Sequence, residues 1–447
     1  MARPSALVYG LAVAGQATAR ALVARGYRVI AADDRPTEAG MAFAAEHGID
    51  LHEAPPAERV GRLVARVDLV VPSPGVPDRH AALAAARSAG IPVRTELDLA
   101  YEWEQHRSGG PRPILAITGT DGKTTTTMLT VAILEAAGHR AVAAGNTDTP
   151  LVSALELDVD VLVVECTSFR LAYLTCFRPD AAVWLNLAED HLDWHSDVGA
   201  YGAAKARMWE FQTEADTAIG FAPDPTVMGY LGRARARRCT FALDNADYHV
   251  ADGFLTGPAG QIAAVNRMRR SLPHDITNAL AASALVLESG LADNAAIDRA
   301  LANFEGIRHR ISFVNEADGI RWYDDSKATT PHAALTAIRA FDHVVLIAGG
   351  RNKNLDLRSM ASEPGRMRAV VATGEAAAEI TEAFEGVCPI EIADSMGEAV
   401  TRARSLAHSG DSVLLSPGCT SFDWYTGYGE RGDDFAKCVA ELLGGGQ

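Results

Sequence analysis

A glycine-rich string between an apolar run and a helical pattern constrains the fold of this chain more than any other feature. The apolar residues 114–118 precede it, the string reads GTDGKTT over residues 119–125, and helical periodicity follows. Glycines let the backbone come close to phosphate groups, and a helix start supplies free N–H groups and the positive end of the helix dipole. The segment predicts a strand, a phosphate-binding turn and a helix, with Lys123 reaching the outer phosphates of a nucleotide and Thr124 reaching Mg²⁺.

The string is not a strict Walker A motif, because Ile117 stands where the first glycine of that motif would be. A plain strand-to-helix turn would also account for it. The strand before the string and the helix after it favour phosphate binding over that alternative.

Apolar, strand-like runs alternate with helical patterns along the whole chain, which is typical of α/β folds with doubly wound parallel sheets. The glycine- and proline-containing segment 108–113 marks a linker, and a new strand–helix series begins after Phe304. We therefore predict Rossmann-like domains at residues 1–110 and 306–447, and a central P-loop-type domain at residues 111–305. Residues 91–96 (IPVRTE) predict a further strand in the first domain.

Composition limits the kinds of partner. The formal net charge of −16 argues against a nucleic-acid-binding surface, but local basic side chains and helix N-termini can still bind anionic small molecules. The six cysteines are scattered without a CxxC pair, which argues against zinc sites and disulfide scaffolds. The chain shows no signal-peptide layout and no apolar run of the ~20 residues that a membrane span needs. We expect a cytoplasmic protein that acts on small molecules.

Candidate metal ligands follow two of the predicted central strands. Glu165 ends the run VLVVE, and a carboxylate at the carboxyl end of a parallel strand points into the crevice where ligands bind. Beside a phosphate-binding turn, Mg²⁺ coordination is a better interpretation of Glu165 than a helix cap or a solvated acid. Lys205 lies in a helical run, and composition alone favours a solvated surface lysine there. The segment NLAEDHLDWH offers Glu189, Asp190, His191, Asp193 and His195, of which we favour His191.

Two groups of polar residues stand out in the last third of the chain. Residues 323–329 (YDDSKAT) follow a predicted strand and combine acids, a hydroxyl and a lysine, which suits a ribose or a carboxylate ligand. Arg310 follows the second predicted boundary, where its planar guanidinium could reach ATP phosphates, although a surface arginine would look the same in sequence. Lys353 follows the strand-end pair Gly349-Gly350 and adds a further cation.

The first predicted turn, residues 10–15 (GLAVAG), is a weak dinucleotide fingerprint, because Ala12 replaces its middle glycine. Asp33 ends the second strand, where an NAD-binding acid would stand, but Arg35 follows two residues later. That cation favours a phosphate-bearing ligand and argues against a dehydrogenase.

The motifs, in order, are GTDGKTTTT, VVECTSF, NLAEDHLDWH, AAKAR, TNALAA, HR, DDSKAT, a double glycine followed by lysine, and SPGCTSFDWY with ERG after it. This series resembles the Mur ligase family over nearly the whole chain, and it is most similar to the MurD-like, glutamate-adding group. The resemblance implies an ATP-dependent ligase that adds D-glutamate to UDP-N-acetylmuramoyl-L-alanine through an acyl-phosphate, in cytoplasmic peptidoglycan precursor synthesis. It also implies a monomer that uses ATP and Mg²⁺.

The resemblance also implies roles for individual residues. It assigns catalysis to Lys123, His191, Lys205 and Arg310. It assigns ATP binding to Gly119, Thr120, Asp121, Gly122, Lys123, Thr124, Thr125, Asn278, Arg310 and Asp325. It assigns Mg²⁺ to Thr124, Glu165, His191 and Lys205, the last as a carbamate, which reverses the surface interpretation of that lysine. It assigns the UDP-sugar to Ala14, Asp34, Arg35, Ser73, Gly75 and Asn146, and the incoming glutamate to Lys327, Thr329, Lys353, Ser421 and Tyr428.

Several strings differ from the family pattern, among them residues 10–15, residues 145–148 (GNTD) and Arg170, which stands in place of a glutamine. Two alternatives therefore stay open. One is a related Mur-type amide ligase with another amino acid, such as L-glutamate, or another acceptor. The other is a nucleotide-binding regulatory protein without turnover, against which the intact set of catalytic residues speaks.

Overall fold

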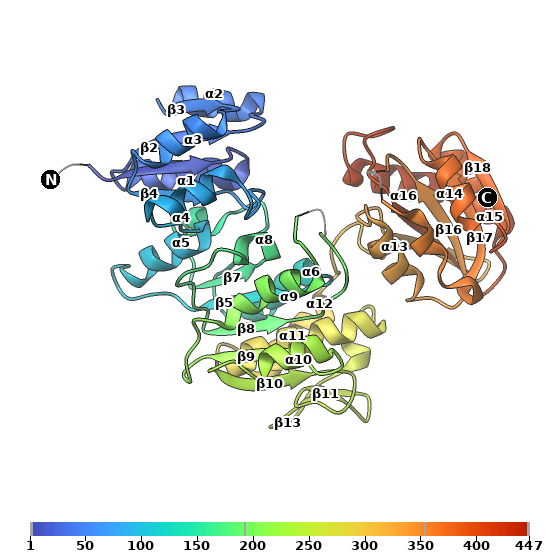
Figure 1. The fold of residues 1–447 in the computed structure, drawn as a ribbon. Coiled ribbons are helices and arrows are strands. Elements are labelled where there is room, and N and C mark those ends of the chain that lie inside the picture. The colour runs from blue at the N-terminus through green and yellow to red at the C-terminus, as the bar shows by residue number, and fades with distance from the viewer. Residues whose placement is uncertain (1–2, 192–193, 353–354, 445–447) are drawn as a thin grey trace. The chain divides into compact units, whose positions relative to one another are not determined.

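The computed structural model describes residues 3–191, 194–352 and 355–444. The chain forms two compact units, Met1–Phe304 and Glu305–Gln447. Helices and strands alternate in both units, as Figure 1 shows.

The first unit begins with a four-stranded parallel sheet in the order β3-β2-β1-β4. Alternate strand residues point to opposite faces, so Ala6 and Val8 join one apolar core while Leu7 and Tyr9 join the other. Helices cover both faces, which buries a parallel sheet completely. The elements are β1 (Ser5–Tyr9), α1 (Val13–Ala24), β2 (Arg28–Asp33), α2 (Glu38–Glu46), β3 (Asp50–Glu53), α3 (Ala57–Val64), β4 (Leu69–Pro72), α4 (Ala81–Ala89) and α5 (Glu96–Gln105).

A six-stranded parallel sheet follows in the same unit, in the order β10-β9-β8-β5-β7-β6. Leu115 and Ile117 of its central strand face one apolar core, and Ile114 and Ala116 face the other. The elements are β5 (Ile114–Thr118), α6 (Lys123–Ala136), β6 (Ala141–Gly145), α7 (Leu151–Ala154), β7 (Val161–Glu165), α8 (Ser168–Leu171), β8 (Ala181–Trp184), α9 (Val198–Ala206), β9 (Thr217–Phe221), α10 (Pro225–Leu231) and β10 (Arg237–Phe241).

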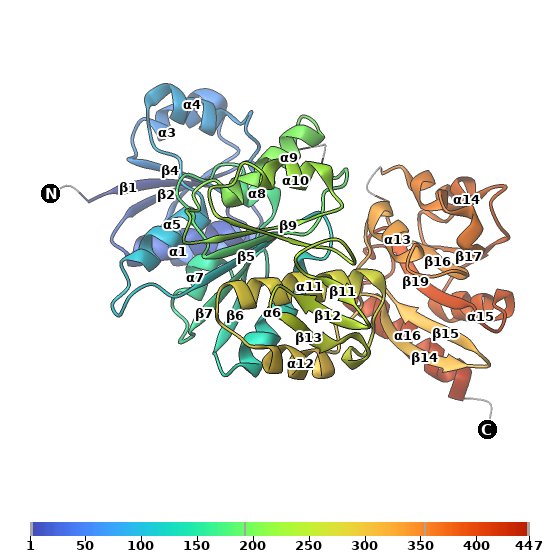
Figure 2. The ribbon, with the colours of Figure 1, turned by 90° about the horizontal axis from the view of Figure 1, so that it is seen from below.

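The rest of the first unit covers one face of this sheet. A small antiparallel sheet, β11 (His249–Ala251), β12 (Phe254–Gly257) and β13 (Gly260–Ala264), precedes the helices α11 (Pro273–Glu288) and α12 (Asn294–Asn303). Both helices pack against α6, and the three lie together in Figure 2. This packing brings α11 to the turn that precedes α6.

The second unit has a six-stranded sheet in the order β14-β15-β19-β16-β17-β18, in which only the edge strand β14 runs antiparallel to its neighbour. The core contains buried residues of β15, β16, β17 and β19 packed against two helices, α15 and α16. The elements are β14 (Ser312–Ala317), β15 (Ile320–Asp324), α13 (Pro331–Ile338), β16 (Val344–Gly349), β17 (Met367–Thr373), α14 (Ala377–Phe384), β18 (Ile390–Ala393), α15 (Met396–Leu406), β19 (Ser412–Gly418) and α16 (Tyr428–Gly444).

The predicted α/β fold class is confirmed, but the strand predicted at residues 91–96 is wrong. Only one bridge, between Val70 and Val93, forms there. Pro92 has no N–H group for a ladder. Thr95 caps α5 instead, in a capping box with Asp98, so the chain turns into a helix where the strand would have continued.

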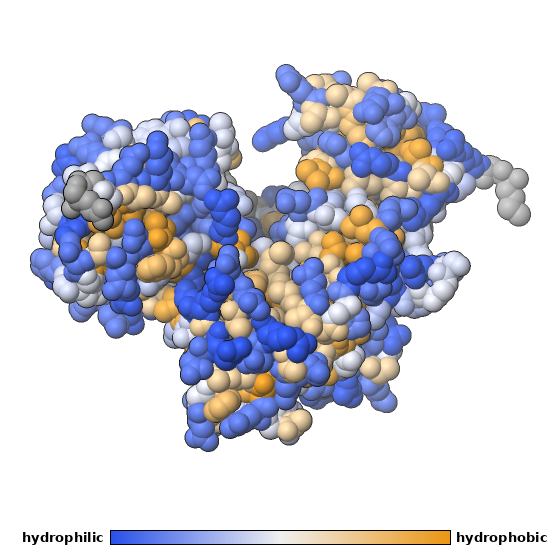
Figure 3. Space-filling view, turned by 180° about the vertical axis from the view of Figure 1, so that it is seen from behind, coloured by the Kyte–Doolittle hydropathy of each residue, from blue (hydrophilic) through white to orange (hydrophobic). Residues whose placement is uncertain are grey.

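In the part of the chain that the structure describes, no helix is long and apolar enough to cross a membrane. Figure 3 shows hydrophilic residues over most of the visible face, with apolar residues in separate patches.

Candidate active site

The predicted phosphate-binding turn lies between β5 and α6, as the sequence indicates. Gly122 is the residue before the first helical position, and its φ of +80° is a left-handed conformation that glycine adopts without strain. A Cβ at this position would lie 2.5 Å from Asn278 Oδ1 of α11, which is closer than such atoms can pack. Gly122 therefore allows Asn278, the predicted adenine contact, to approach the turn. Thr124 and Thr125 lie in the first turn of α6.

We expect Gly122→Ala to raise the KM for ATP by about thirtyfold or more, because strain and the clash with Asn278 would each cost on the order of 1–2 kcal/mol. Steady-state kinetics with varied ATP measures this. Gly138→Ala, after the end of the same helix, is the matched control, since Gly138 also has a positive φ of 95° but has no atoms within 4 Å of the added Cβ. Equal KM values for the two variants would contradict the role of Gly122.

Asn186, which sequence reasoning missed, holds this turn in place. Its Oδ1 accepts hydrogen bonds from the backbone N–H groups of Thr120 and Asp121, both at 2.9 Å, and its Nδ2 donates to Asp121 O. Asn186 follows β8, which neighbours β5 in the sheet. The signal in the sequence was an asparagine just after a strand, three residues before Glu189, the first of the candidate acids and histidines.

Two lysines converge on one carbonyl oxygen of the turn. Lys123 Nζ donates to Gly119 O at 2.9 Å and to Thr120 O at 2.7 Å, and Lys205 Nζ donates to Gly119 O at 2.6 Å. The interpretation of Lys205 as a solvated lysine is wrong, because the residue is only 1% exposed. Burial lowers the pKa of Lys205 well below its usual range, and the charge of Lys123 lowers it further. Burial therefore favours the neutral amine of Lys205, which is the nucleophilic form, over the charged ammonium.

Glu165 ends β7 next to this turn and is 2% exposed. Its Oε1 accepts a hydrogen bond from Asn146 Nδ2 at 3.0 Å, while its Oε2 is buried without a hydrogen-bond partner among the described residues. A buried carboxylate oxygen without a donor is costly unless a cation or a water satisfies it. The carboxylate, the Thr124 hydroxyl of the first helical turn and the nearby lysines fit the binding of Mg²⁺ with a nucleotide.

An aromatic cluster lies beside these groups. The Phe169 ring is 4.6 Å from the His191 ring and 5.0 Å from that of Trp194. Tyr201 lies 6.1 Å from His191, and its ring is 4.4 Å from Lys205 Nζ. The structure thus brings both His191 and Lys205 close to one tyrosine, Tyr201, which the sequence did not single out.

The two histidines of this segment differ in their surroundings. His195 is buried, and its Nε2 is 2.9 Å from the Ser168 hydroxyl, which is a structural role. The His191 side chain is 41% exposed and adopts a φ of +55°. The His191 side chain is therefore accessible to a ligand, whereas that of His195 is not, and the assignment of His191 to the metal stays a prediction. Asp193 lies outside the described residues.

The predicted ATP contacts of the second unit lie close together. Asp325 is buried, its Oδ2 accepts from the Ser416 hydroxyl at 2.7 Å, and its Oδ1 accepts from the Ile311 N–H at 3.2 Å. Burial raises the pKa of Asp325 to about 6, although the charge of Arg310 opposes that shift. His309, next to Arg310, pairs with Asp324 at 2.6 Å and fixes the chain before β14.

Most of the predicted glutamate contacts also lie in this unit. Lys327 Nζ is 5.7 Å from the centre of the Tyr428 ring, and the Thr329 N–H donates to Lys327 O. Ser421 is buried in the loop after β19, and its carbonyl accepts from the Tyr425 N–H. The structure therefore brings Lys327 and Tyr428 together, with Thr329 two residues after Lys327 in the same loop. Lys353 lies outside the described residues.

The predicted UDP-sugar residues fall into two places. Asp34, Arg35 and Ser73 follow parallel strands of the first sheet, so they share its carboxyl edge, and Ser73 Oγ donates to Gly10 O at 2.6 Å. Gly75 O accepts from the Trp194 indole at 3.3 Å. Ala14 lies in the first turn of α1, whereas Asn146 lies against Glu165, on the central sheet.

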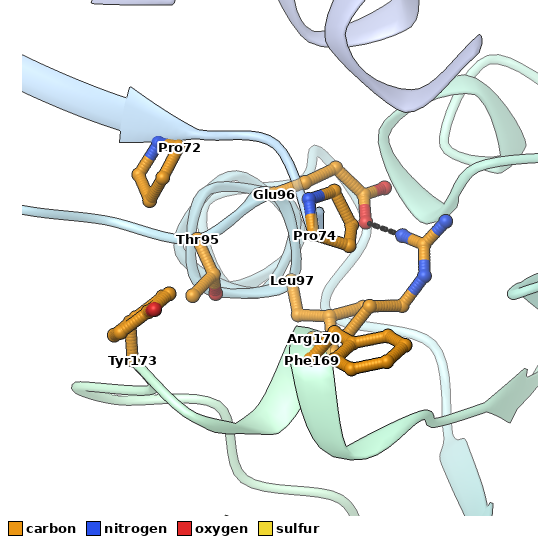
Figure 4. Close-up of a pocket in the computed structure, with 8 residues that line it drawn as sticks. All are labelled: Pro72, Pro74, Thr95, Glu96, Leu97, Phe169, Arg170 and Tyr173. Atoms are coloured by element: carbon orange, nitrogen blue, oxygen red, sulfur yellow. Dashed lines mark hydrogen bonds and ion pairs between the residues drawn. The ribbon is translucent and has the colours of Figure 1, made fainter. Parts of the chain in front are cut away.

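A buried ion pair joins helix α5 to the central sheet. Arg170 Nη1 donates to Glu96 Oε2 at 2.7 Å, and Glu96 Oε1 accepts from the Val152 N–H at the start of α7. Figure 4 shows this pair beside a pocket that Pro72, Pro74 and Phe169 also line. Burial raises the pKa of Glu96, and the Arg170 guanidinium opposes that shift.

We expect Arg170→Ala to lower the free energy of unfolding by about 3 kcal/mol, because it leaves the Glu96 carboxylate buried without its cation. Urea unfolding followed by tryptophan fluorescence measures this. The double variant Glu96→Gln/Arg170→Gln removes both charges and is expected to recover most of the loss. Arg62→Ala, which breaks the exposed pair with Glu58, is the control and should change nothing measurable. If Arg170→Ala lowered the free energy of unfolding as little as Arg62→Ala does, the buried ion pair of Arg170 with Glu96 would not stabilise the fold.

Comparison with known proteins gives three matching family models in chain order. They are a Mur ligase MurD-like N-terminal domain at residues 4–95, a Mur ligase middle domain at 117–286 and a Mur ligase glutamate ligase domain at 309–419. A curated relative from Frankia casuarinae, called UDP-N-acetylmuramoylalanine–D-glutamate ligase, is 43% identical over 97% of this chain and 93% of its own. A relative of the same name from Mycolicibacterium vanbaalenii is 38% identical over 98% of each chain.

Solved structures show the same fold at lower identity. MurC from Thermotoga maritima gives a TM-score of 0.57 at 18% identity, and the match covers 100% of both chains. MurF from Acinetobacter baumannii gives a TM-score of 0.59 at 18% identity, and the match covers 93% of this chain and 86% of the MurF chain.

The three family models and the curated relatives therefore define a ligase of the ATP-dependent class, and the chain belongs to the Mur ligase family. Its N-terminal domain and its curated relatives place it in the MurD-like part of that family.

Proposed function

We propose that this enzyme uses ATP to join D-glutamate to UDP-N-acetylmuramoyl-L-alanine, with ADP and phosphate as the other products. The observation that carries the proposal is the name shared by the curated relatives, which align with this chain from end to end at 38–43% identity. The described residues add a turn that suits phosphates and a buried carboxylate oxygen of Glu165 that suits a cation.

Each part of ATP and the Mg²⁺ ion is assigned to its own set of residues. Lys123 and the backbone N–H groups at the start of α6 hold the ATP phosphates. Asn278 contacts the adenine, Asp325 the ribose and Arg310 the phosphates. Thr124, Glu165, His191 and a carbamylated Lys205 hold Mg²⁺, which when bound neutralises charge on the phosphate oxygens. The low pKa of Lys205 supports the carbamate, because a neutral amine adds to carbon dioxide and a charged one does not.

The chemistry proceeds in two displacements. A carboxylate oxygen of the acceptor attacks the γ-phosphorus, the bond from that phosphorus to the β-phosphate oxygen breaks, and ADP leaves. The acyl-phosphate that results has a good leaving group, so the neutral amine of D-glutamate attacks its carbonyl carbon. Phosphate leaves with the carboxylate oxygen, and the nitrogen loses a proton. Lys123 and Arg310 lower the first barrier by holding the phosphate charge in place.

The remaining assignments complete the proposal. Ala14, Asp34, Arg35, Ser73, Gly75 and Asn146 bind the UDP-sugar, and Lys327, Thr329, Lys353, Ser421 and Tyr428 bind glutamate. We propose domain limits at 1–110, 111–305 and 306–447, and a cytoplasmic monomer.

The test supplies ATP, Mg²⁺ and UDP-N-acetylmuramoyl-L-alanine with a panel of D- and L-amino acids, and measures phosphate release and product mass. Phosphate release that needs D-glutamate, with a product heavier by one glutamate residue, supports the proposal. Release with another amino acid alone would mean a related ligase of different specificity. No amino-acid-dependent release with any acceptor would mean a nucleotide-binding protein without turnover.

A further inference from the structure

A buried arginine of α16, Arg431, lies at the carboxyl edge of the sheet in the second unit. It is the middle residue of the string Glu430-Arg431-Gly432 and is 3% exposed. Its Nε donates to the Ser326 hydroxyl at 2.9 Å, and its Nη2 donates to Ser326 O at 2.9 Å and to Cys419 O at 3.1 Å. Ser326 follows β15 and Cys419 follows β19, which are neighbouring strands. One guanidinium therefore joins the loops after two parallel strands.

The third nitrogen of the guanidinium, Nη1, faces the loop after a third strand. β16 lies next to β19 in the sheet, and Gly350 directly follows β16. A Cβ at Gly350 would lie 3.0 Å from Arg431 Nη1 and would overlap with Thr420 O, so glycine leaves this space open. Arg431 Nη1 is buried and has no hydrogen-bond partner among the described residues. The guanidinium thus reaches the carboxyl ends of three adjacent strands, the edge where open α/β sheets bind ligands.

The charge of Arg431 has no carboxylate bonded to it in the described part of the chain, since its hydrogen bonds go to two carbonyl oxygens and a hydroxyl. The acids that act on it from further away, Asp423 and Asp324, bond to the Glu375 N–H and to His309 instead. Burial lowers the pKa of Arg431 to about 10, so the side chain stays charged at neutral pH. A buried charge of this kind is costly to fold and favours an anionic ligand at the same edge.

Each loop that the guanidinium reaches carries a predicted contact of the incoming glutamate. Lys327 lies in the loop after β15, Ser421 in the loop after β19, and Lys353, outside the described residues, after β16. The Ser326 hydroxyl, which accepts from Arg431 Nε, also donates to Tyr428 O at 2.8 Å. The side chain of Arg431 is therefore the common support of contacts that come from separate parts of the sequence.

We propose that Arg431 is a positioning residue of the glutamate subsite, which holds the three strand-end loops at the spacing that the two carboxylates of glutamate require. The inference rests on the proposed function, which assigns glutamate to these loops. Arginine suits this role because its planar guanidinium directs N–H groups along fixed directions, whereas lysine offers one compact charge on a flexible stem. Because the loops are ordered before glutamate arrives, binding does not have to order them.

Arg431→Lys tests the role directly, because it keeps the charge and removes the fork. We expect it to raise the KM for D-glutamate about tenfold and to leave the KM for UDP-N-acetylmuramoyl-L-alanine within about twofold. The acceptor should be unaffected because its proposed contacts lie in the first unit. Steady-state kinetics with each substrate varied in turn measures both constants.

Two further variants guard against a loss of folding. Ser326→Ala keeps the cation and removes one hydroxyl of the network, so it should raise the KM for D-glutamate about threefold. Arg431→Ala should raise it about a hundredfold, and millimolar guanidinium chloride should recover part of this, because the ion fits the space beside Ser326 O and Cys419 O. Sodium chloride at equal ionic strength should recover none.

Arg368→Ala is the matched control for stability. Arg368 begins β17 and pairs with the buried Asp411 before β19, at 3.1 Å, which is the amino edge of the same sheet. Its loss should lower the melting temperature of the second unit, since a buried carboxylate loses its cation. It should leave the KM for D-glutamate unchanged, because no predicted substrate contact lies at that edge.

The outcomes distinguish this inference from the proposed function. If Arg431→Lys melts earlier but keeps the wild-type KM for D-glutamate, the inference is overturned while the function stands. If the wild type shows no turnover that depends on D-glutamate, the proposed function fails, and hydrogen exchange still tests the support of the loops. Faster exchange after β15 and β19 in Arg431→Lys than in Arg368→Ala supports it, and equal exchange overturns it.

Discussion

Lys123→Ala is expected to lower kcat at least about a hundredfold and to leave the fold intact. Lys123 is the cation at the start of α6, and its Nζ already lies on the turn, within 2.9 Å of Gly119 O and 2.7 Å of Thr120 O. Removing one preorganised charge that stabilises a transferring phosphoryl group costs about 10²–10³ in rate. Steady-state kinetics measures kcat, and circular dichroism checks the fold.

The control for this variant is Lys437→Ala, which removes an exposed lysine of α16 that pairs with Glu441. It should retain normal kcat. Near-normal turnover by Lys123→Ala would show that the turn between β5 and α6 does not hold the phosphates, and the ATP site would have to be sought elsewhere.

Lys205→Ala is expected to lower kcat about a hundredfold, and millimolar formate or acetate is expected to recover part of it. The reason is that a small carboxylate can occupy the space of the carbamate and supply its anionic oxygens to Mg²⁺. Lys205 is buried and donates to Gly119 O, so truncation also leaves a small polar cavity that such an ion can enter. Kinetics with and without added carboxylate measures the rescue.

Two comparisons make the Lys205 experiment specific. Chloride at equal ionic strength should not restore the kcat of Lys205→Ala. Formate or acetate should not restore the kcat of Lys123→Ala, because that variant lacks a cation, which an added anion cannot replace. Full activity of Lys205→Ala without any additive would mean that Lys205 has only a structural role. In the wild type, ¹³C-labelled bicarbonate should give a carbamate signal that Lys205→Ala lacks.

The sequence predicted the position of a motif in the fold where a strand pattern precedes the motif or a helix pattern follows it. The turn at Gly119–Thr125 lies where apolar residues give way to a helical pattern, and Glu165 ends a buried strand as expected. These features depend on neighbours in the sequence, so periodicity was enough to find them.

Contacts between distant segments were harder to predict. Asn186 supports the turn across 65 residues of sequence, and Arg170 pairs with Glu96 across 74. Nothing local marks either contact, because each partner alone looks like an ordinary polar residue. Lys205 was misread on composition for the same reason: its helix is turned so that the lysine faces the buried side, and only the tertiary structure decides that.

Asp34 gives a further example. The sequence indicated Asp33 as the strand-end acid and assigned Asp34 only through family resemblance. The structure shows that backbone N–H groups occupy Asp33, while Tyr9 and His80 hold Asp34. Whether Asp34 makes side-chain hydrogen bonds therefore depends on residues that lie 25 and 46 positions away in the sequence.

The central claim is that the acceptor carboxylate is activated as an acyl-phosphate. It is tested most directly with an acceptor in which both oxygens of the alanine carboxylate are ¹⁸O, turned over with unlabelled ATP and D-glutamate. The oxygen that attacks the γ-phosphorus stays with it, so the account predicts that each phosphate released contains one ¹⁸O by mass spectrometry. Phosphate without label, formed together with the amide product, would contradict the account.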